Sequence, residues 1–201
     1  MINVPNAITI TRVFVAIGTC ALLWVPGDGM RWAAFVLTVL VMWGDGLDGF
    51  FARKLNQCTK LGAVLDIAGD RVVEMLYWIV FAVLGWIPAW VPIIFLVRGT
   101  FVDAIRAQVS EQGFTAFGAK TMMQSPVGKF LVASNFSRFS YAVAKAAAFC
   151  LVIAGHINQA PPAVLAAGLF CTYFSTAFCI IRGLPVLIEA RPLLSGDQEK
   201  K

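Results

Sequence analysis

Long apolar stretches dominate the hydrophobicity pattern of this chain, and short polar or breaker-rich segments separate them. About 20 apolar residues form a helix that crosses a hydrocarbon core of about 30 Å. Six stretches are close to this length: residues 7–25, 31–52, 61–87, 88–105, 141–157 and 162–188. The segments between them include 26–29 and 155–162, which are rich in the glycine and proline that end helices. The pattern therefore predicts an all-α membrane protein with six transmembrane helices.

Two further regions are more polar than these stretches. Residues 1–12 mix apolar positions with Asn3, Asn6 and Arg12, which fits either a short N-terminal interfacial helix or a juxtamembrane tail. Residues 106–140 are too polar to span a membrane, so we expect a connection that is helical in part. Residues 1–201 then form a single membrane domain.

Composition and charge agree with a membrane protein. Hydrophobic residues make up 59% of the chain and charged residues 13%, which is far more apolar than a soluble domain of this length. The five cysteines are scattered without a paired spacing, which favours apolar packing over metal or disulfide roles. The net charge of +5 fits cations held at an anionic membrane surface, so nucleic-acid binding is not supported.

Lysine and arginine are distributed unevenly over the predicted connections. Three connections contain or adjoin only Arg31, whereas the cations on the other side are Arg53, Lys54, Lys60, Arg106, Lys120, Lys129, Arg138, Arg191, Lys200 and Lys201. Because lysine and arginine accumulate on the cytoplasmic side of a membrane, we expect both termini in the cytoplasm.

Four carboxylates interrupt the second and third predicted spans: Asp45, Asp48, Asp66 and Asp70. A carboxylate at membrane depth is costly unless it faces a partner, a cavity or a cation. The first two are three residues apart and the last two are four apart, so each pair lies on one helix face. Oxygen ligands of this kind suit Mg²⁺ or Mn²⁺ better than zinc. The pattern predicts a divalent-metal site that acts on a phosphate or diphosphate.

Small residues and an arginine accompany these acids. Positions without side-chain bulk let a ligand or another backbone approach closely, and here they are Gly46, Gly49, Ala52 and Gly62. Tight helix packing is the alternative explanation for the glycines. Arg53 can contact a phosphate through two parallel hydrogen bonds.

These positions together read Asp45-x2-Asp48-Gly49-x2-Ala52-Arg53-x8-Gly62-x3-Asp66-x3-Asp70. The spacing resembles, without departure, the signature of the CDP-alcohol phosphotransferase family. Eight fixed positions across 26 residues make this a specific match, although it covers only the second and third predicted spans.

The resemblance implies a fold, a reaction and partners. The fold would be six transmembrane helices around a cytoplasm-facing polar cavity, in a homodimer in the plasma membrane. The reaction would transfer a phosphatidyl group from CDP-diacylglycerol, or a related CDP-alcohol, to an alcohol acceptor and release CMP. It would need two Mg²⁺ or Mn²⁺ ions and no soluble cofactor.

The resemblance also implies roles for the motif residues. The metals would be held by Asp45, Asp48 and Asp66, while Asp70 would contribute a ligand and act as the general base toward the acceptor hydroxyl. The nucleotide and diphosphate site would be shaped by Gly49, Ala52, Arg53 and Gly62.

Three cations outside the motif bear on the acceptor: Lys120, Arg138 and Arg182. Arg182 is costly inside an apolar span unless it faces a polar cavity or reaches the interface. If the three converge, they suit a phosphate on the incoming alcohol. The chain is thus more similar to phosphatidylglycerophosphate or phosphatidylinositol-phosphate synthases than to serine or choline enzymes, with glycerol 3-phosphate ahead of inositol phosphate.

Two alternatives stay open. The same chemistry could act on an unphosphorylated acceptor such as serine, choline or inositol. A divalent-cation transporter also needs acids on facing membrane helices, but here the acids lie in the cytoplasmic halves of two spans rather than along a path through the membrane.

Glu74 and His156 are polar residues outside the motif. Glu74 lies one turn after Asp70, and we favour a structural pair with an arginine over support of the metal cluster. His156 is most simply a polar residue at the membrane interface.

Overall fold

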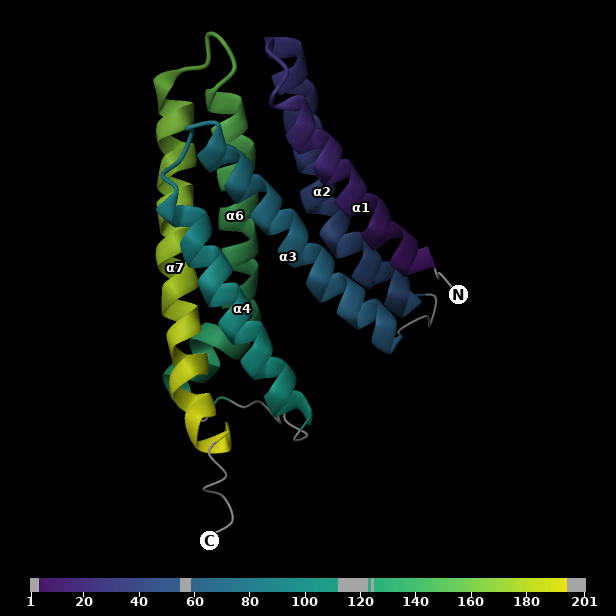
Figure 1. The fold of residues 1–201 in the computed structure, drawn as a ribbon, viewed down its shortest axis with the longest axis vertical. Helices are drawn as coiled ribbons and strands as arrows, with labels where there is room; N and C mark the ends of the chain where they lie inside the picture. Colours follow the sequence, from purple (N-terminus) through teal and green to yellow (C-terminus); the bar gives the residue numbers. More distant parts are fainter. Residues whose placement is uncertain (1–3, 55–58, 112–122, 124, 195–201) are drawn as a thin grey trace, which may run out of the picture. The chain divides into compact units, whose positions relative to one another are not determined.

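The computed structural model describes residues 4–54, 59–111, 123 and 125–194, and regular structure within these ranges is helical (Figure 1). The side chains of residues 45–53, 60, 110–111 and 191–194 lie outside this description. The long helices are α1 (Val4–Leu22), α2 (Asp28–Lys54), α3 (Lys60–Val83), α4 (Trp90–Glu111), α6 (Asn135–Gly155) and α7 (Pro162–Leu194). Helix α5 (Pro126–Gly128) and the π-helical turn η1 (Lys129–Ala133) precede α6.

Each predicted span overlaps one of these long helices, which confirms the all-α class. Within the described residues, three segments are long and apolar enough to cross a membrane: Val4–Leu22, Asn135–Gly155 and Pro162–Ala190. These spans make the chain an integral membrane protein. The count of six spans remains a prediction, because part of α2 lies outside the described side chains, and α3 and α4 carry more charged residues than these three segments.

Within its described residues, the structure does not show the separate N-terminal interfacial helix that was one of the two interpretations of residues 1–12. Helix α1 runs without interruption from Val4 to Leu22, so residues 4–12 are its first turns and not a separate interfacial helix. The reason is packing, since three polar residues in these turns are buried: Asn6, Thr9 and Arg12. Polar side chains that would favour the interface are instead turned against neighbouring helices.

The described residues form two compact units. Unit 1 comprises Met1–Pro92 and Ala146–Phe170, and unit 2 comprises Ile93–Lys145 and Cys171–Lys201. Within unit 1, α1 packs against both α2 and α3 (Figure 1).

Aromatic side chains form the centre of unit 1. Tyr77, Trp78 and Phe81 of α3 are fully buried. The Phe149 ring of α6 lies 4.8 Å from the Tyr77 ring and 4.5 Å from the Trp78 ring, between centroids. The Tyr77 hydroxyl is 3.1 Å from the Thr38 hydroxyl of α2, so the buried phenol has a hydrogen-bond partner. These contacts join α2, α3 and α6.

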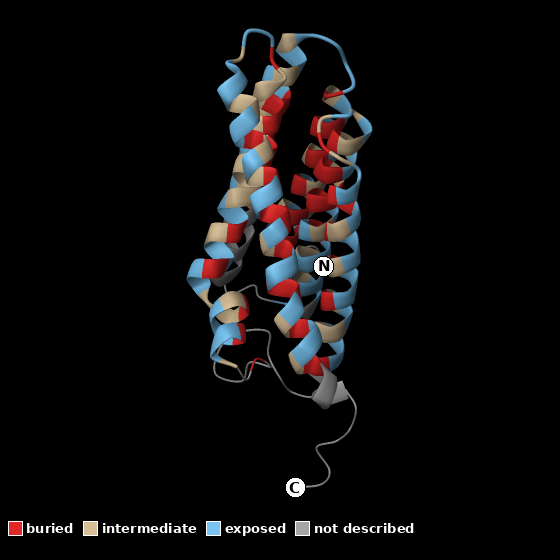
Figure 2. Cartoon of the chain, turned by 90° about the vertical axis from the view of Figure 1, so that its left-hand side faces the viewer, coloured by how far each residue is buried: buried red, intermediate tan, exposed pale blue. Residues whose placement is uncertain are grey.

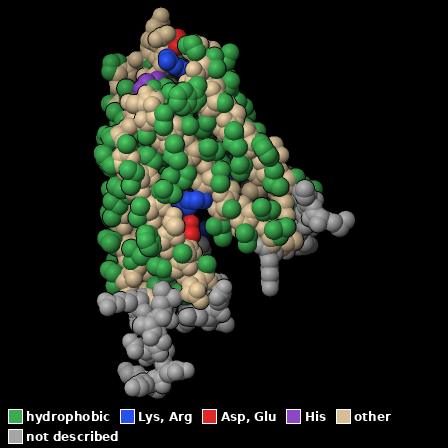
Figure 3. Space-filling model, viewed as in Figure 1, with side chains coloured by type: hydrophobic (Ala, Val, Ile, Leu, Met, Phe, Trp, Pro, Cys, Tyr) green, Lys and Arg blue, Asp and Glu red, His purple; other side chains and the backbone are tan. Residues whose placement is uncertain are grey.

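Large apolar side chains also cover the outside of the helices. Phe14, Trp43 and Phe170 are each about two-thirds exposed or more. Figure 2 shows buried and exposed residues alternating around single helices, and Figure 3 shows apolar side chains spread over the face in view. Exposed apolar surface of this extent fits contact with lipid.

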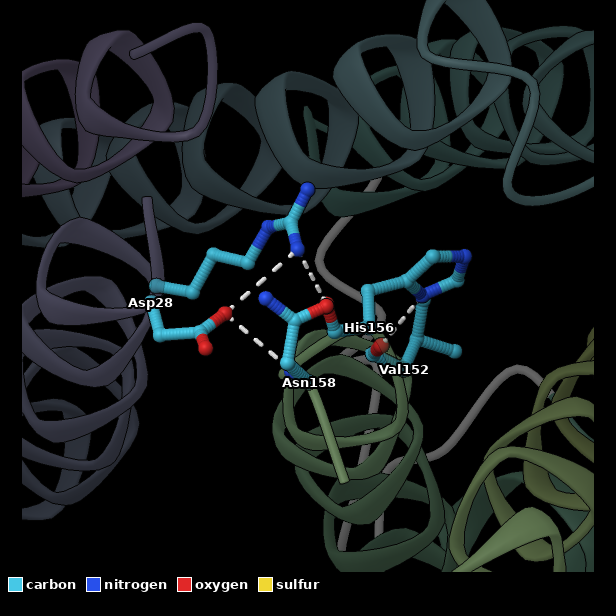
Figure 4. A network of polar contacts seen from close by, with 5 residues as sticks. Asp28, Val152, His156 and Asn158 are labelled. Atoms are coloured by element: carbon cyan, nitrogen blue, oxygen red, sulfur yellow. Dashed lines mark hydrogen bonds and ion pairs between the residues drawn. The ribbon is translucent and has the colours of Figure 1, made fainter. Parts of the chain in front are cut away.

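A polar network in unit 1 joins the start of α2 to the turn between α6 and α7 (Figure 4). Arg31 Nη1 donates to the His156 carbonyl at 2.5 Å, and the backbone N–H of Asn158 donates to Asp28 Oδ1 at 3.1 Å. The His156 ring stacks on Trp86, with 4.0 Å between centroids. His156 therefore contacts the turn after α3 through its ring and the start of α2 through its carbonyl.

Helices α6 and α7 approach closely through two glycines. A Cβ on Gly168 would lie 2.8 Å from the backbone nitrogen of Val152, and one on Gly155 would lie 2.7 Å from Leu165 Cα. Both clashes involve backbone atoms, which cannot move aside as a flexible side chain can. The crossing therefore depends on glycine.

We expect Gly168→Ala to destabilise the protein by about 1–3 kcal/mol, because its methyl group overpacks this crossing. The measurement is the thermal unfolding temperature of the purified protein in detergent. Gly18→Ala is the matched control, since a Cβ there meets no atom within 4 Å. Equal unfolding temperatures for the two variants would contradict the close crossing.

Candidate functional site

Helix α3 places two of the motif aspartates on one face. Asp66 and Asp70 lie one turn apart in an unbroken helix. The helix begins after Thr59, whose side chain accepts a hydrogen bond from the backbone N–H of Gly62 at 2.9 Å. Helix α2 runs unbroken through Asp45 and Asp48 to Lys54, although the side chains of these two aspartates lie outside the described ones.

Helix α1 brings an arginine to the last aspartate of the motif. Arg12 Nη2 donates to Asp70 Oδ1, and the side chains are 5% and 50% exposed, respectively. Arg12 was expected only as a polar residue of the N-terminal region, and this contact was not predicted. The signal that could have found it is the spacing of Asn6, Thr9 and Arg12, because residues three apart share one helix face.

Two glycines of α3 face this polar side of α1. A Cβ on Gly62 would lie 2.8 Å from Asn6 Oδ1, and one on Gly69 would lie 3.0 Å from Thr9 Cγ2. Gly62 thus allows the close packing that the sequence analysis kept as an alternative. Its role in nucleotide binding stays a prediction.

Glu74 pairs with an arginine on its own helix. Arg71 Nη1 lies 2.6 Å from Glu74 Oε2, and Glu74 is 8% exposed. The favoured structural pairing is thus present, three residues apart on α3.

Arg182 of α7 is buried in unit 2, with 5% exposure. It donates to the Ser137 carbonyl at 3.2 Å and to the Val132 carbonyl at 3.4 Å. Its guanidinium lies 5.2 Å from the centre of the Tyr141 ring. Arg182 therefore joins α7 to η1 and to the first turn of α6.

Two further arginines lie within electrostatic range of Arg182: Arg98 of α4 and Arg138 of α6. Arg98 also packs against α7, since a Cβ on Gly183 would lie 2.9 Å from Arg98 Cγ. Three like charges from three helices make this region attractive to an anion. Arg138 and Arg182 were predicted to bind the acceptor, whereas Arg98 was not among the predicted acceptor residues. Lys120 lies outside the described residues.

Helix α7 also contacts the chain just before α5, through Glu189. Ser125 Oγ donates to Glu189 Oε1 at 2.5 Å, and the Ser125 backbone N–H donates to Glu189 Oε2 at 3.2 Å. Ser125 also caps α5 by accepting from the Gly128 N–H at 2.9 Å. These bonds fix the chain that leads to Arg138.

A family model described as CDP-alcohol phosphatidyltransferase matches residues 2–181. The chain belongs to this family. The match extends well beyond the motif at residues 45–70, on which the prediction of the family rested.

Three curated relatives of this chain have names that state a reaction or a product. The proteins from Bacillus subtilis and Pseudomonas fluorescens are named CDP-diacylglycerol–glycerol-3-phosphate 3-phosphatidyltransferase. The Bacillus subtilis protein is 27% identical over 56% of this chain and 65% of its own length. The Pseudomonas fluorescens protein is 28% identical over 76% of this chain and 83% of its own length. A Mycobacterium tuberculosis protein named "Probable phosphatidylglycerophosphate synthase" is 26% identical over 90% of this chain and 82% of its own length.

Coverage of some relatives is partial. The chain spans 65% of the Bacillus subtilis protein and 63% of a Wigglesworthia glossinidia brevipalpis relative of the same name, which is less than two thirds of each. The names of the relatives therefore enter below only as support for a proposal.

The two motif aspartates whose side chains are described have oxygen atoms that fit a hard divalent cation. Asp66 and Asp70 offer carboxylate oxygens from one helix face, and Asp70 is half exposed. Such ligands suit Mg²⁺ or Mn²⁺. Among the side chains that the structure describes, no three histidine, cysteine, aspartate or glutamate residues gather around one point. The four-aspartate site thus stays a prediction, because Asp45 and Asp48 lie outside that set.

Four of the five cysteines lie in the described part of the chain, where Cys20, Cys150, Cys171 and Cys179 are free thiols. Cys20 and Cys179 are buried, as packing residues are. Cys58 lies outside the described residues.

Proposed function

We propose that this protein transfers the phosphatidyl group of CDP-diacylglycerol to glycerol 3-phosphate and releases CMP, as a step of phospholipid biosynthesis. The observation that carries the proposal is the face of α3 with Asp66 and Asp70, inside a complete family motif. The family match and the names of the relatives support the donor and the acceptor.

The proposed reaction is a substitution at phosphorus. The acceptor hydroxyl oxygen forms a bond to the phosphatidyl phosphorus, the bond from that phosphorus to the bridging oxygen breaks, and CMP leaves with the electron pair. Asp70 takes the hydroxyl proton, and Arg53 with the small residues Gly49, Ala52 and Gly62 accommodates the nucleotide diphosphate. Mg²⁺ or Mn²⁺ ions held by Asp45, Asp48, Asp66 and Asp70 would neutralise the diphosphate charge.

The acceptor assignment rests on unit 2. Arg98, Arg138 and Arg182 form a positive region that matches the charge of a phosphorylated polyol. Lys120 belongs to the same proposal from its sequence position. An acceptor without a phosphate would leave these charges without a role in binding.

Product identification tests the proposed function. The purified protein is incubated with Mg²⁺, CDP-diacylglycerol and one acceptor at a time: glycerol 3-phosphate, inositol phosphate, inositol, serine or choline. We expect CMP and phosphatidylglycerophosphate with glycerol 3-phosphate. CMP release only with an unphosphorylated acceptor would overturn the acceptor, and no CMP release with any of them would overturn the reaction class and reopen cation transport.

The finer topology belongs to the same proposal. Six spans, a polar cavity open to the cytoplasm, cytoplasmic termini and a homodimer in the plasma membrane are what the family resemblance and the distribution of cations support. A cytoplasm-facing site would give a soluble phosphorylated acceptor direct access.

Cysteine labelling tests the orientation. In a background without the five native cysteines, Gly29→Cys should react with a membrane-impermeant reagent from outside intact cells. Gly29 suits the probe because it is exposed and a Cβ there meets no atom within 4 Å. A cysteine at Gln112 should react only after permeabilisation, and the reverse pattern would contradict the orientation.

A further inference from the structure

The eight-position motif does not include the arginine that contacts its last aspartate. Arg12 of α1 donates through Nη2 to Asp70 Oδ1 on α3. We propose that Arg12 is a positioning residue for Asp70, whose ion pair fixes the orientation of the carboxylate that takes the acceptor proton. This inference rests on the proposed function, because it assigns Asp70 the part of the base.

Arg12 is confined between helices and so provides a fixed anchor. Its side chain is 5% exposed. A Cβ on Gly44 of α2 would lie 3.6 Å from Arg12 Cδ, and one on Gly69 of α3 would lie 3.9 Å from Nη2. These distances are ordinary van der Waals contacts, so the backbones at Gly44 of α2 and Gly69 of α3 lie directly beside the Arg12 side chain.

The first turns of α1 hold the arginine in this place. Asn6 and Thr9 are 5% and 4% exposed and lie on the same side of α1 as Arg12. The Asn6 side chain reaches Gly62, and the Thr9 side chain reaches Gly69. Helix α1 is thus packed along α3 for two turns before Arg12, which fixes the guanidinium relative to Asp70.

Asp70 needs such an anchor more than a buried residue would. Half of its side-chain surface is exposed, so packing alone does not select one rotamer. A general base must lie within hydrogen-bond reach of the proton it accepts, and a displacement of about 1 Å can cost about 10²-fold in rate. The Arg12 contact supplies the constraint that packing does not.

Steady-state kinetics test this role. Arg12→Gln should lower kcat by about 10–100-fold, because Asp70 loses its orientation. The KM values for CDP-diacylglycerol and glycerol 3-phosphate should change less than about threefold, because ground-state binding is unaffected. Arg12→Lys should recover part of kcat, since it restores the charge without the planar donor fork. The matched control is Arg31→Gln, which removes another arginine paired with an aspartate of unit 1 and should keep kcat.

A double-mutant cycle separates positioning from a general structural effect. In an Asp70→Asn background, Arg12→Gln should cause no further loss of kcat. The unsubstituted protein, the two single variants and the double variant are then unfolded thermally in EDTA. If the two side chains act as a pair, the double variant should unfold at the temperature of the less stable single variant. This second measurement needs neither metal nor activity.

Three results would overturn the inference. Arg12→Gln could keep more than half of kcat, or it could raise a KM with kcat unchanged. It could also lower kcat by the same factor in the Asp70→Asn background as in the unsubstituted protein. If Arg12→Gln does not fold, a kcat of Arg12→Lys equal to that of the unsubstituted protein would overturn it as well. Inactivity of the unsubstituted protein toward every acceptor would instead overturn the proposed function, and the EDTA cycle would still test the contact.

Discussion

Asp66→Asn and Asp70→Asn should each nearly abolish phosphatidyl transfer at saturating Mg²⁺. A correctly placed base contributes about 10²–10⁴-fold to a rate, and loss of a ligand to a catalytic cation should cost a similar factor. Asparagine keeps the size of the side chain but removes its negative charge. The measurement is the rate of CMP release from CDP-diacylglycerol by the purified variants.

Asp28→Asn is the matched control for these two variants. Asp28 lies at the first turn of α2, about 25 Å along the helix from Asp45 at 1.5 Å per residue. Its carboxylate contacts Arg31 and the Asn158 backbone, so its loss should affect stability and not transfer. Near-full activity of Asp66→Asn or Asp70→Asn would show that the proposed site is wrong.

The sequence predicted the helices well because their signal is strong. Each apolar stretch is close to the length that a membrane requires, and breaker residues separate the stretches. The boundaries were less accurate where polar residues continue a helix. Helix α4 extends to Glu111, beyond the predicted end at residue 105, because residues that leave an apolar stretch can still form helical hydrogen bonds.

The candidate site was predicted only in part. Asp66 and Asp70 followed from charge in an apolar helix, but the Arg12 contact depends on how α1 packs against α3. The spacing of Asn6, Thr9 and Arg12 marks a polar face of α1, but it does not say which helix that face contacts. In the same way, Arg98 could not be linked to Arg182, because 84 positions separate them in the sequence. Gly69 shows the same limit, since only the structure reveals Thr9 next to it.

The structure also changes how the acceptor site should be tested. Arg182 bonds to the carbonyls of Val132 and Ser137, so Arg182→Gln would release the segment before α6 as well as remove a cation. A raised KM in that variant would have two explanations. Arg138 is exposed, and its replacement is the cleaner test of acceptor binding.

Arg138→Gln should raise the KM for glycerol 3-phosphate by about 10–100-fold, because a hydrogen bond to a charged group contributes about 1.5–3 kcal/mol. The KM for CDP-diacylglycerol should change little, since the proposed donor site lies on α2 and α3. Lys129→Gln is the matched control, as it removes an exposed cation of η1, nine residues earlier. Initial rates with one substrate varied at a time measure both constants. Equal rises for the two substrates, or equal effects of the two variants, would contradict acceptor recognition by Arg138 and leave the transfer chemistry of the motif aspartates intact.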